Sequence, residues 1–203
     1  NAIDLKGNFY ENYTIFVAEI ASTFNEQNLL DYFMADPSLS KEVKISLLQK
    51  AIDNIMSTFY RQTLFADYEL KAHELIENNS PINYQVLSSI MIDLYKKYYD
   101  LDITKEKVKK YVWAYIPHLF GSPFYVYQYA TSFAASFKIY QDVKDGVEGA
   151  FERYTNLLKA GGSKYPVDEA KDAGVDFTKR ETFEAVTKRM TELVDMLEKL
   201  LEE

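Results

Sequence analysis

The stretch ISLLQKAIDNIMSTF, residues 45–59, decides the fold class of this 203-residue chain. Its large apolar residues recur at alternating spacings of three and four, at Ile45, Leu48, Ile52, Ile55 and Phe59. This period places them along one stripe of an α-helix. The helix is expected to begin after Asp36-Pro37-Ser38 and to run to about Glu77, where Asn78-Asn79-Ser80-Pro81 ends it.

Helical patterns also cover most of the remaining chain. They predict helices at residues 12–34, 82–98, 104–116, 123–143 with a continuation to 160, 166–173 and 180–202. Ser122 suits an N-cap ahead of Pro123, and Gly161-Gly162 suits a helix end. Because no segment has a convincing strand pattern, we predict an all-α fold, with residues 1–203 forming a single multi-helical domain and no substantial sheet.

The last predicted helix carries a narrow apolar seam between Phe183 and Leu200, whose members are again spaced by three and four. Such a seam is compatible with a coiled coil. It covers too few heptads to favour that reading, so docking of the helix on the domain is expected instead.

The composition excludes several classes of function. The net charge is −8 and the pI is near 4.9, so nucleic acid and anionic membranes are not expected partners. Without cysteine the chain has no disulfide and no thiolate ligand, which is compatible with a cytoplasmic location. Residues 111–137 lack charge, but Pro117, Gly121 and Pro123 interrupt them, so they predict a buried wall rather than a membrane span. The start at Asn1, without a leader, favours a fragment or cleaved product.

Two glutamates without a neighbouring cation lie in FVAEIASTFNE, residues 16–26. Neither Glu19 nor Glu26 has a lysine or arginine at ion-pair spacing, because none occurs between Lys6 and Lys41. On a helix both carboxylates share a face that adjoins an apolar stripe. If this face is buried, a distant cation, a bound proton or a metal ion must compensate the charge. Composition alone favours a carboxylate that borders solvent or pairs with a remote arginine.

Arg61 is the single basic residue between Lys50 and Lys71, and it lies among aromatic and aliphatic residues. We interpret it as one half of a buried ion pair between two helices, with Glu19, Glu26, Asp67 and Glu69 as candidate partners.

The stretch HELIE, residues 73–77, lacks the second histidine of a His-Glu-x-x-His zinc motif, so His73 is read as part of a polar helix end.

The stretch IPHLFGSPFYVYQYATS, residues 116–132, holds the densest group of candidate donors. Tyr125 and Tyr129 are one helical turn apart, Tyr127 points elsewhere, and His118 lies in the preceding Pro- and Gly-interrupted loop. Phenol and imidazole donors of this kind can bind a carbonyl oxygen or its developing oxyanion. The alternative is an aromatic core whose hydroxyls bond to the backbone.

Four blocks in this order, YTIFVAEIASTFNE, RQTLFADYE, IPHLFGSPFYVYQYATS and GGSKYP, resemble the C-terminal part of the oligoendopeptidase F enzymes of the zinc-dependent M3 metallopeptidase family. The resemblance runs from about Tyr13 to at least Asp176. It implies the C-terminal portion of a larger helical catalytic domain that hydrolyses short oligopeptides by attack of metal-activated water on the peptide carbonyl.

The resemblance implies a metal site shared with other segments. Glu19 matches the third zinc ligand of the family, which would explain a carboxylate without a nearby cation, since a dication neutralises it. Glu26 would then belong to the surrounding layer that orients a ligand histidine, and we place Arg61 in the same layer.

The resemblance also assigns the donors of the third block. His118 and Tyr125 match the residues that stabilise the tetrahedral intermediate. Tyr127 and Tyr129 match substrate-binding tyrosines, whose spacing varies among branches of the family.

This chain departs from the family in having no His-Glu-x-x-His motif. Two zinc ligands and the general base would therefore come from a missing N-terminal part of the same enzyme, and the chain alone is expected to be inactive. The competing hypothesis is a non-enzymatic all-helical interaction module that uses the seam from Phe183 to Leu200.

Overall fold

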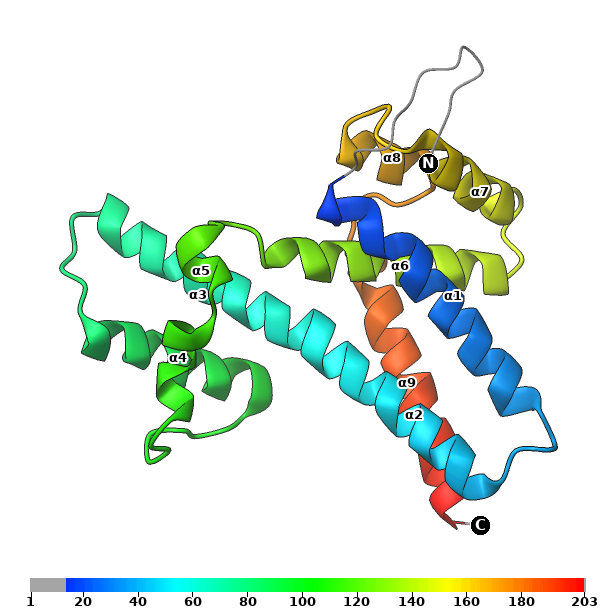
Figure 1. Ribbon diagram of the computed structural model, residues 1–203, viewed down its shortest axis with the longest axis horizontal. Coiled ribbons are helices and arrows are strands. Elements are labelled where there is room, and N and C mark those ends of the chain that lie inside the picture. The colour runs from blue at the N-terminus through cyan, green and yellow to red at the C-terminus, as the bar shows by residue number, and fades with distance from the viewer. Residues whose placement is uncertain (1–13, 203) are drawn as a thin grey trace. The chain divides into compact units, whose positions relative to one another are not determined.

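A computed structural model describes residues 14–202, and every regular element in that range is a helix (Figure 1). The elements in chain order are α1 (Ile15–Ala35), α2 (Lys41–Ile55), the π-helical η1 (Met56–Tyr60), α3 (Arg61–Glu77), α4 (Tyr84–Tyr99), the 3-10 helix η2 (Lys109–Tyr115), α5 (His118–Gly121), α6 (Tyr127–Lys144), α7 (Ala150–Ala160), α8 (Pro166–Asp172) and α9 (Arg180–Glu202). The all-α prediction is confirmed.

The described chain forms two compact units. The first unit contains residues 14–56 and 131–202, and the second contains residues 57–130. The chain passes from one unit to the other at the π-helical turn after α2 and again within α6. This division concerns compactness, so the single-domain organisation stays a prediction.

The helical run that contains residues 45–59 begins and ends where its flanking residues indicate. Ser40 is the N-cap of α2, and its hydroxyl accepts a hydrogen bond from the Val43 N–H. After the π-helical turn, α3 continues to Glu77 and stops at the predicted Asn- and Pro-containing segment. The predicted run from the first segment to Glu77 is thus confirmed, with one π-helical interruption.

Three predicted helix boundaries or types are wrong. The segment predicted as a helix at 104–116 contains a 3-10 helix, η2. Ser122 and Pro123 do not start the next helix, which begins at Tyr127. The predicted continuation to residue 160 is broken into α6 and α7, because Gly146 and Gly149 have φ values of 70° and 71° and turn the chain.

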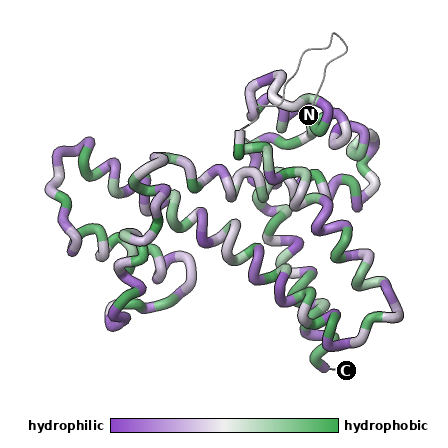
Figure 2. Tube along the Cα trace, in the orientation of Figure 1, coloured by the Kyte–Doolittle hydropathy of each residue, from purple (hydrophilic) through white to green (hydrophobic). Residues whose placement is uncertain are grey.

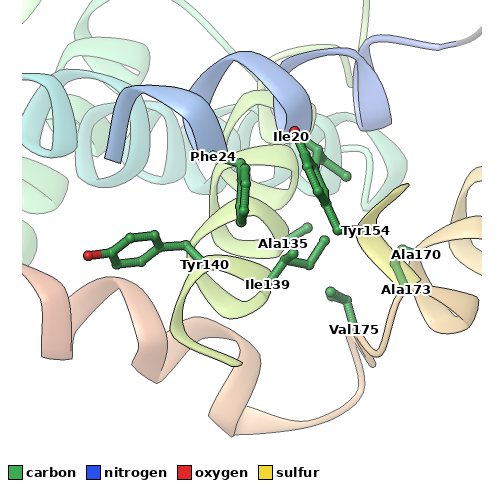
Figure 3. Packing of buried hydrophobic residues seen from close by; sticks show 9 residues of the cluster. All are labelled: Ile20, Phe24, Ala135, Ile139, Tyr140, Tyr154, Ala170, Ala173 and Val175. Carbon is green, nitrogen blue, oxygen red and sulfur yellow. The ribbon is translucent and has the colours of Figure 1, made fainter. Parts of the chain in front are cut away.

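An aliphatic and aromatic cluster forms the core of the first unit (Figure 3). The members come from α1, from α6 to α8 and from the loop after α8: Ile20, Phe24, Ala135, Ile139, Tyr140, Tyr154, Ala170, Ala173 and Val175. The ring of Phe24 stacks on that of Tyr154 with centroids 3.9 Å apart. Because Ile20 and Phe24 face this core, the predicted apolar stripe of α1 is confirmed.

Helix α9 packs along α2 within the first unit. Val186 and Leu193 are fully buried, and no member of the predicted seam is exposed. Figure 2 shows hydrophilic and hydrophobic residues interspersed along both helices. The predicted docking of the last helix on the domain is therefore confirmed, and the seam is not a free contact surface.

Arg189 of α9 is a buried cation at the centre of the first unit, with 1% of its surface exposed. Its guanidinium donates hydrogen bonds to Gln27 Oε1 at 3.1 Å and to Asp31 Oδ1 at 2.5 Å, both on α1, and to Glu192 Oε2 at 3.1 Å. It also lies 5.0 Å from the ring centroid of Tyr140, whose hydroxyl donates to Asp31. One side chain thus ties α1 and α6 to α9.

The second unit has its own apolar core, built mainly by α3 and α4. Leu64, Met91 and Leu94 are almost completely buried there. Trp113 of η2 donates its indole N–H to Ser88 Oγ at 3.2 Å, which fixes the 3-10 helix against α4. Among residues 14–202 no helix is long and apolar enough to cross a membrane.

We predict that Arg189→Met lowers the free energy of unfolding of this chain by roughly 3 kcal/mol, because the hydrogen bonds of a buried charged group are lost and Asp31 keeps its charge. Urea denaturation followed by circular dichroism measures the change. The neighbouring Lys188→Met is the control, since Lys188 forms only an exposed ion pair with Asp145 at 3.6 Å. Equal unfolding midpoints for the two variants would contradict a central role of Arg189.

Candidate functional site

His118 and Tyr125 meet face to face in the second unit. His118 is the first residue of the short helix α5, and Tyr125 lies in the turn that leads into α6. The two ring centroids are 5.2 Å apart and the ring planes differ by 7°. Both side chains are half-buried, so a hydroxyl and an imidazole lie together at a partly open surface.

Tyr129 completes an aromatic cluster with these two residues. Its ring lies edge-on to Tyr125 at 5.5 Å and to His118 at 6.2 Å. The predicted proximity of Tyr125 and Tyr129 is confirmed, although Tyr125 precedes the first turn of α6 rather than lying in it. Tyr127 is 41% exposed, and none of the ring contacts within this cluster involves it.

The loop before Tyr125 contains a contact that the sequence analysis did not find. Glu69 of α3 has 3% of its surface exposed, and its Oε1 accepts the backbone N–H of Phe124 at 2.7 Å. The sequence indicated Glu69 only as one possible partner of Arg61. A glutamate in a partly apolar stretch of the predicted helix was the available signal, but its partner is 55 residues away in the sequence.

A pocket of about 190 Å³ lies in the same unit. Its walls are mainly apolar and include Trp113 together with Leu119 and Phe120, the two residues that follow His118. Tyr68 also lines it, and the Tyr68 hydroxyl has no hydrogen-bond partner among the described residues. Burial raises the pKa of this hydroxyl well above its ordinary value, so it remains a protonated donor. The mainly apolar walls suit an apolar group.

Glu19 and Glu26 lie on the exposed side of α1 in the first unit. The hydroxyl of Ser22 donates to Glu19 Oε2 at 2.7 Å. In the described part of the chain no lysine or arginine pairs with Glu19. Because both glutamates are exposed, neither needs a compensating charge within the described residues. The arrangement matches the alternative in which the carboxylate borders solvent.

Arg61 does not form the predicted buried ion pair. Its side chain is exposed, and its guanidinium lies 5.3 Å from the ring centroid of Phe65, one turn further along α3. Asp67 pairs instead with Lys97 at 2.8 Å and with Lys71 at 3.5 Å. The prediction failed because the carboxylate closest in sequence is already satisfied by lysines.

The described residues contain no group of three His, Asp or Glu side chains that could hold a metal ion. Glu19 can contribute one carboxylate to a metal site, since its side chain is exposed and, among the described residues, accepts a hydrogen bond only at Oε2 from Ser22. His73 is likewise remote from any ligand set, and its ring contacts that of Phe124 at 4.7 Å between centroids.

Comparisons with known proteins identify the family. The model of Peptidase family M3 matches residues 5–189. The chain is 43% identical over 173 residues to an oligoendopeptidase F homologue of Borreliella burgdorferi, which covers 85% of this chain and 29% of that protein. It is 37% identical over 192 residues to the oligopeptidase PepF of Bacillus subtilis, which covers 95% of this chain and 28% of that protein.

A solved structure agrees with these sequence matches. Oligoendopeptidase-F from Enterococcus faecium superposes with a TM-score of 0.85 at 34% sequence identity, which covers 94% of this chain and 36% of that chain. The chain therefore belongs to peptidase family M3. It spans 28–29% of the length of the two curated relatives named above. The resemblance stated from the four sequence blocks is confirmed.

Proposed function

We propose that this chain supplies the substrate-side part of the active site of a zinc-dependent oligopeptidase. The observation that carries the proposal is the cluster in which the rings of His118 and Tyr125 stack and Tyr129 closes the side. In a member of peptidase family M3, two such donors at a partly open surface suit the carbonyl of a bound peptide.

His118 and Tyr125 are proposed to donate hydrogen bonds to the carbonyl oxygen of the scissile peptide bond. Donors aimed at an oxygen on which negative charge develops lower the barrier, because they bind the transition state more strongly than the substrate. Tyr129 holds the Tyr125 ring from the side, and the exposed Tyr127 is proposed to contact the peptide beyond the reacting bond.

Glu19 is proposed as the one zinc ligand that this chain contributes. Its exposed carboxylate, held at one oxygen by Ser22, fits a ligand whose site is completed by other segments. A zinc ion bound there would act as a Lewis acid toward the peptide carbonyl. Glu26, on the exposed side of the same helix, is proposed to hydrogen-bond a ligand histidine supplied from outside this chain.

The remaining ligands and the general base are proposed to come from a preceding segment of the same polypeptide, with a His-Glu-x-x-His motif. Substrates would be short peptides, and the pocket lined by Trp113, Leu119 and Phe120 would accept an apolar side chain. The acidic, cysteine-free composition is compatible with a cytoplasmic location, which we retain as a proposal.

One prediction of the proposed function concerns the metal. In a polypeptide that joins this chain to the motif-bearing segment, Glu19→Gln is expected to remove most of the bound zinc and the peptidase activity, because an amide is a poor substitute for an anionic ligand. Elemental analysis after gel filtration measures the zinc content. Glu198→Gln, an exposed position on α9, is the control. Retention of one zinc per molecule by the Glu19 variant would refute the assignment.

The second prediction concerns the donor. In the same polypeptide, Tyr125→Phe is expected to lower kcat by roughly 100-fold with little change in KM, since a hydrogen bond made mainly in the transition state is lost. Steady-state hydrolysis of a fluorogenic peptide measures both constants. Tyr165→Phe, at a side chain that is 81% exposed in the first unit, is expected to be unchanged. An unaltered kcat in the Tyr125 variant would reduce that residue to a packing role.

A further inference from the structure

The residue directly before Tyr125 has an unusual backbone conformation. Phe124 has a φ of 57°, in the left-handed region that L-residues with large side chains rarely adopt. A conformation of this kind persists only where surrounding contacts hold it. The contacts that hold Phe124 therefore also determine the direction in which the chain presents Tyr125.

Glu69 provides the first of these contacts. Its buried carboxyl group accepts the Phe124 N–H at 2.7 Å, so this acceptor bonds directly to the residue in the left-handed conformation. Breaking this bond would leave the N–H without that acceptor and would remove a restraint on the φ angle of Phe124.

His73 provides the second contact, from the same face of α3. It lies four residues after Glu69, one helical turn along, and its ring meets the Phe124 ring at 4.7 Å with a tilt of 41°. Helix α3 thus holds Phe124 by its backbone and by its side chain. The residue that the sequence placed in a polar helix end therefore has a packing role beside the aromatic cluster.

We propose that Glu69 and His73 form a clamp of positioning residues that fixes Phe124 and thereby sets Tyr125 parallel to His118. The importance of the clamp for catalysis rests on the function proposed above for His118 and Tyr125. The geometric part can be tested on its own, because Phe124 directly precedes Tyr125, whose ring lies at 7° to that of His118.

If Glu69 only stabilised the fold, its replacement would affect His118 no more than replacement of another buried glutamate. Glu169 is a matched control for this alternative. Glu169 of α8 is also 3% exposed, and it accepts the backbone N–H of Lys164 at 3.2 Å. It belongs to the first unit, whereas the clamp belongs to the second. Glu169→Met should weaken the fold without disturbing the His118 ring.

The test compares Glu69→Gln with Glu69→Met in this chain, because glutamine keeps an acceptor for the Phe124 N–H and methionine has the same length without one. The readout is the NMR chemical shift of the His118 ring protons, which the stacked Tyr125 ring shields. The chain has two histidines, so His118→Asn assigns the signal by its loss, and Tyr125→Leu gives the shift of the unstacked ring.

The expected result is a wild-type shift in Glu69→Gln and Glu169→Met, and a shift displaced toward that of Tyr125→Leu in Glu69→Met. If Glu69→Met does not fold, Glu69→Asp replaces it, because its shorter side chain withdraws the acceptor while keeping the charge. An unmoved His118 signal in the variant that withdraws the acceptor overturns the clamp, as does an equal displacement in Glu169→Met.

The catalytic consequence is tested in the polypeptide that includes the motif-bearing segment. There Glu69→Met is expected to lower kcat roughly 10- to 100-fold through misplacement of Tyr125, with Glu69→Gln close to wild type. If Glu69→Met displaces the His118 signal while Tyr125→Phe keeps full activity, the proposed function fails and the clamp stands. If Tyr125→Phe loses activity while Glu69→Met leaves the signal unchanged, the clamp alone fails.

Discussion

The buried guanidinium of Arg189 is the interaction on which the first unit depends. Burying a cation is costly unless its hydrogen bonds are satisfied, and here Gln27 and Asp31 of α1 satisfy two of them from one helix. The direction of α1 is therefore fixed by bonds at its second half, and the exposed face with Glu19 is carried on the first half of the same rigid helix. The contact of Arg189 with the second half of α1 therefore helps to determine where Glu19 lies on the first half.

The second unit also contains a buried ionisable side chain, that of Glu69. Glu69 is as deeply buried as Gln27 beside Arg189, but its partner is a backbone N–H rather than a side chain. A buried carboxyl group is restricted to the geometry in which this hydrogen bond forms, and the bond in turn restrains the loop that leads into α6. In both units a buried polar side chain fixes the position of a neighbouring segment, in addition to any contribution to stability.

The sequence predicted the helices better than the contacts that orient them. The apolar spacing of three and four that begins at Ile45 reflects the helical period, which is a local property of the chain. The helical run that contains α2 and α3 was therefore found, and its flanking residues indicated its ends. The start of α6 was missed because Ser122 and Pro123 form a good local cap signal, while the conformation of Phe124 is held by a residue 55 positions away. Local preference and tertiary contact disagreed, and the tertiary contact prevailed.

The candidate site shows the same division between local and distant information. The grouping of His118 with Tyr125 was predictable because both lie in one short segment. The ion pair of Arg61 was not, because the choice among four carboxylates depends on which of them already have cations, and Lys97 reaches Asp67 from another helix. The exposure of Glu19 likewise depends on how distant segments pack and could not be predicted from the local sequence. A carboxylate that is accessible and unpaired with a cation keeps the lone pairs a metal needs, whereas one buried against an arginine would have lost them. The low burial of Glu19 in this chain is therefore compatible with a ligand whose metal and remaining partners come from elsewhere.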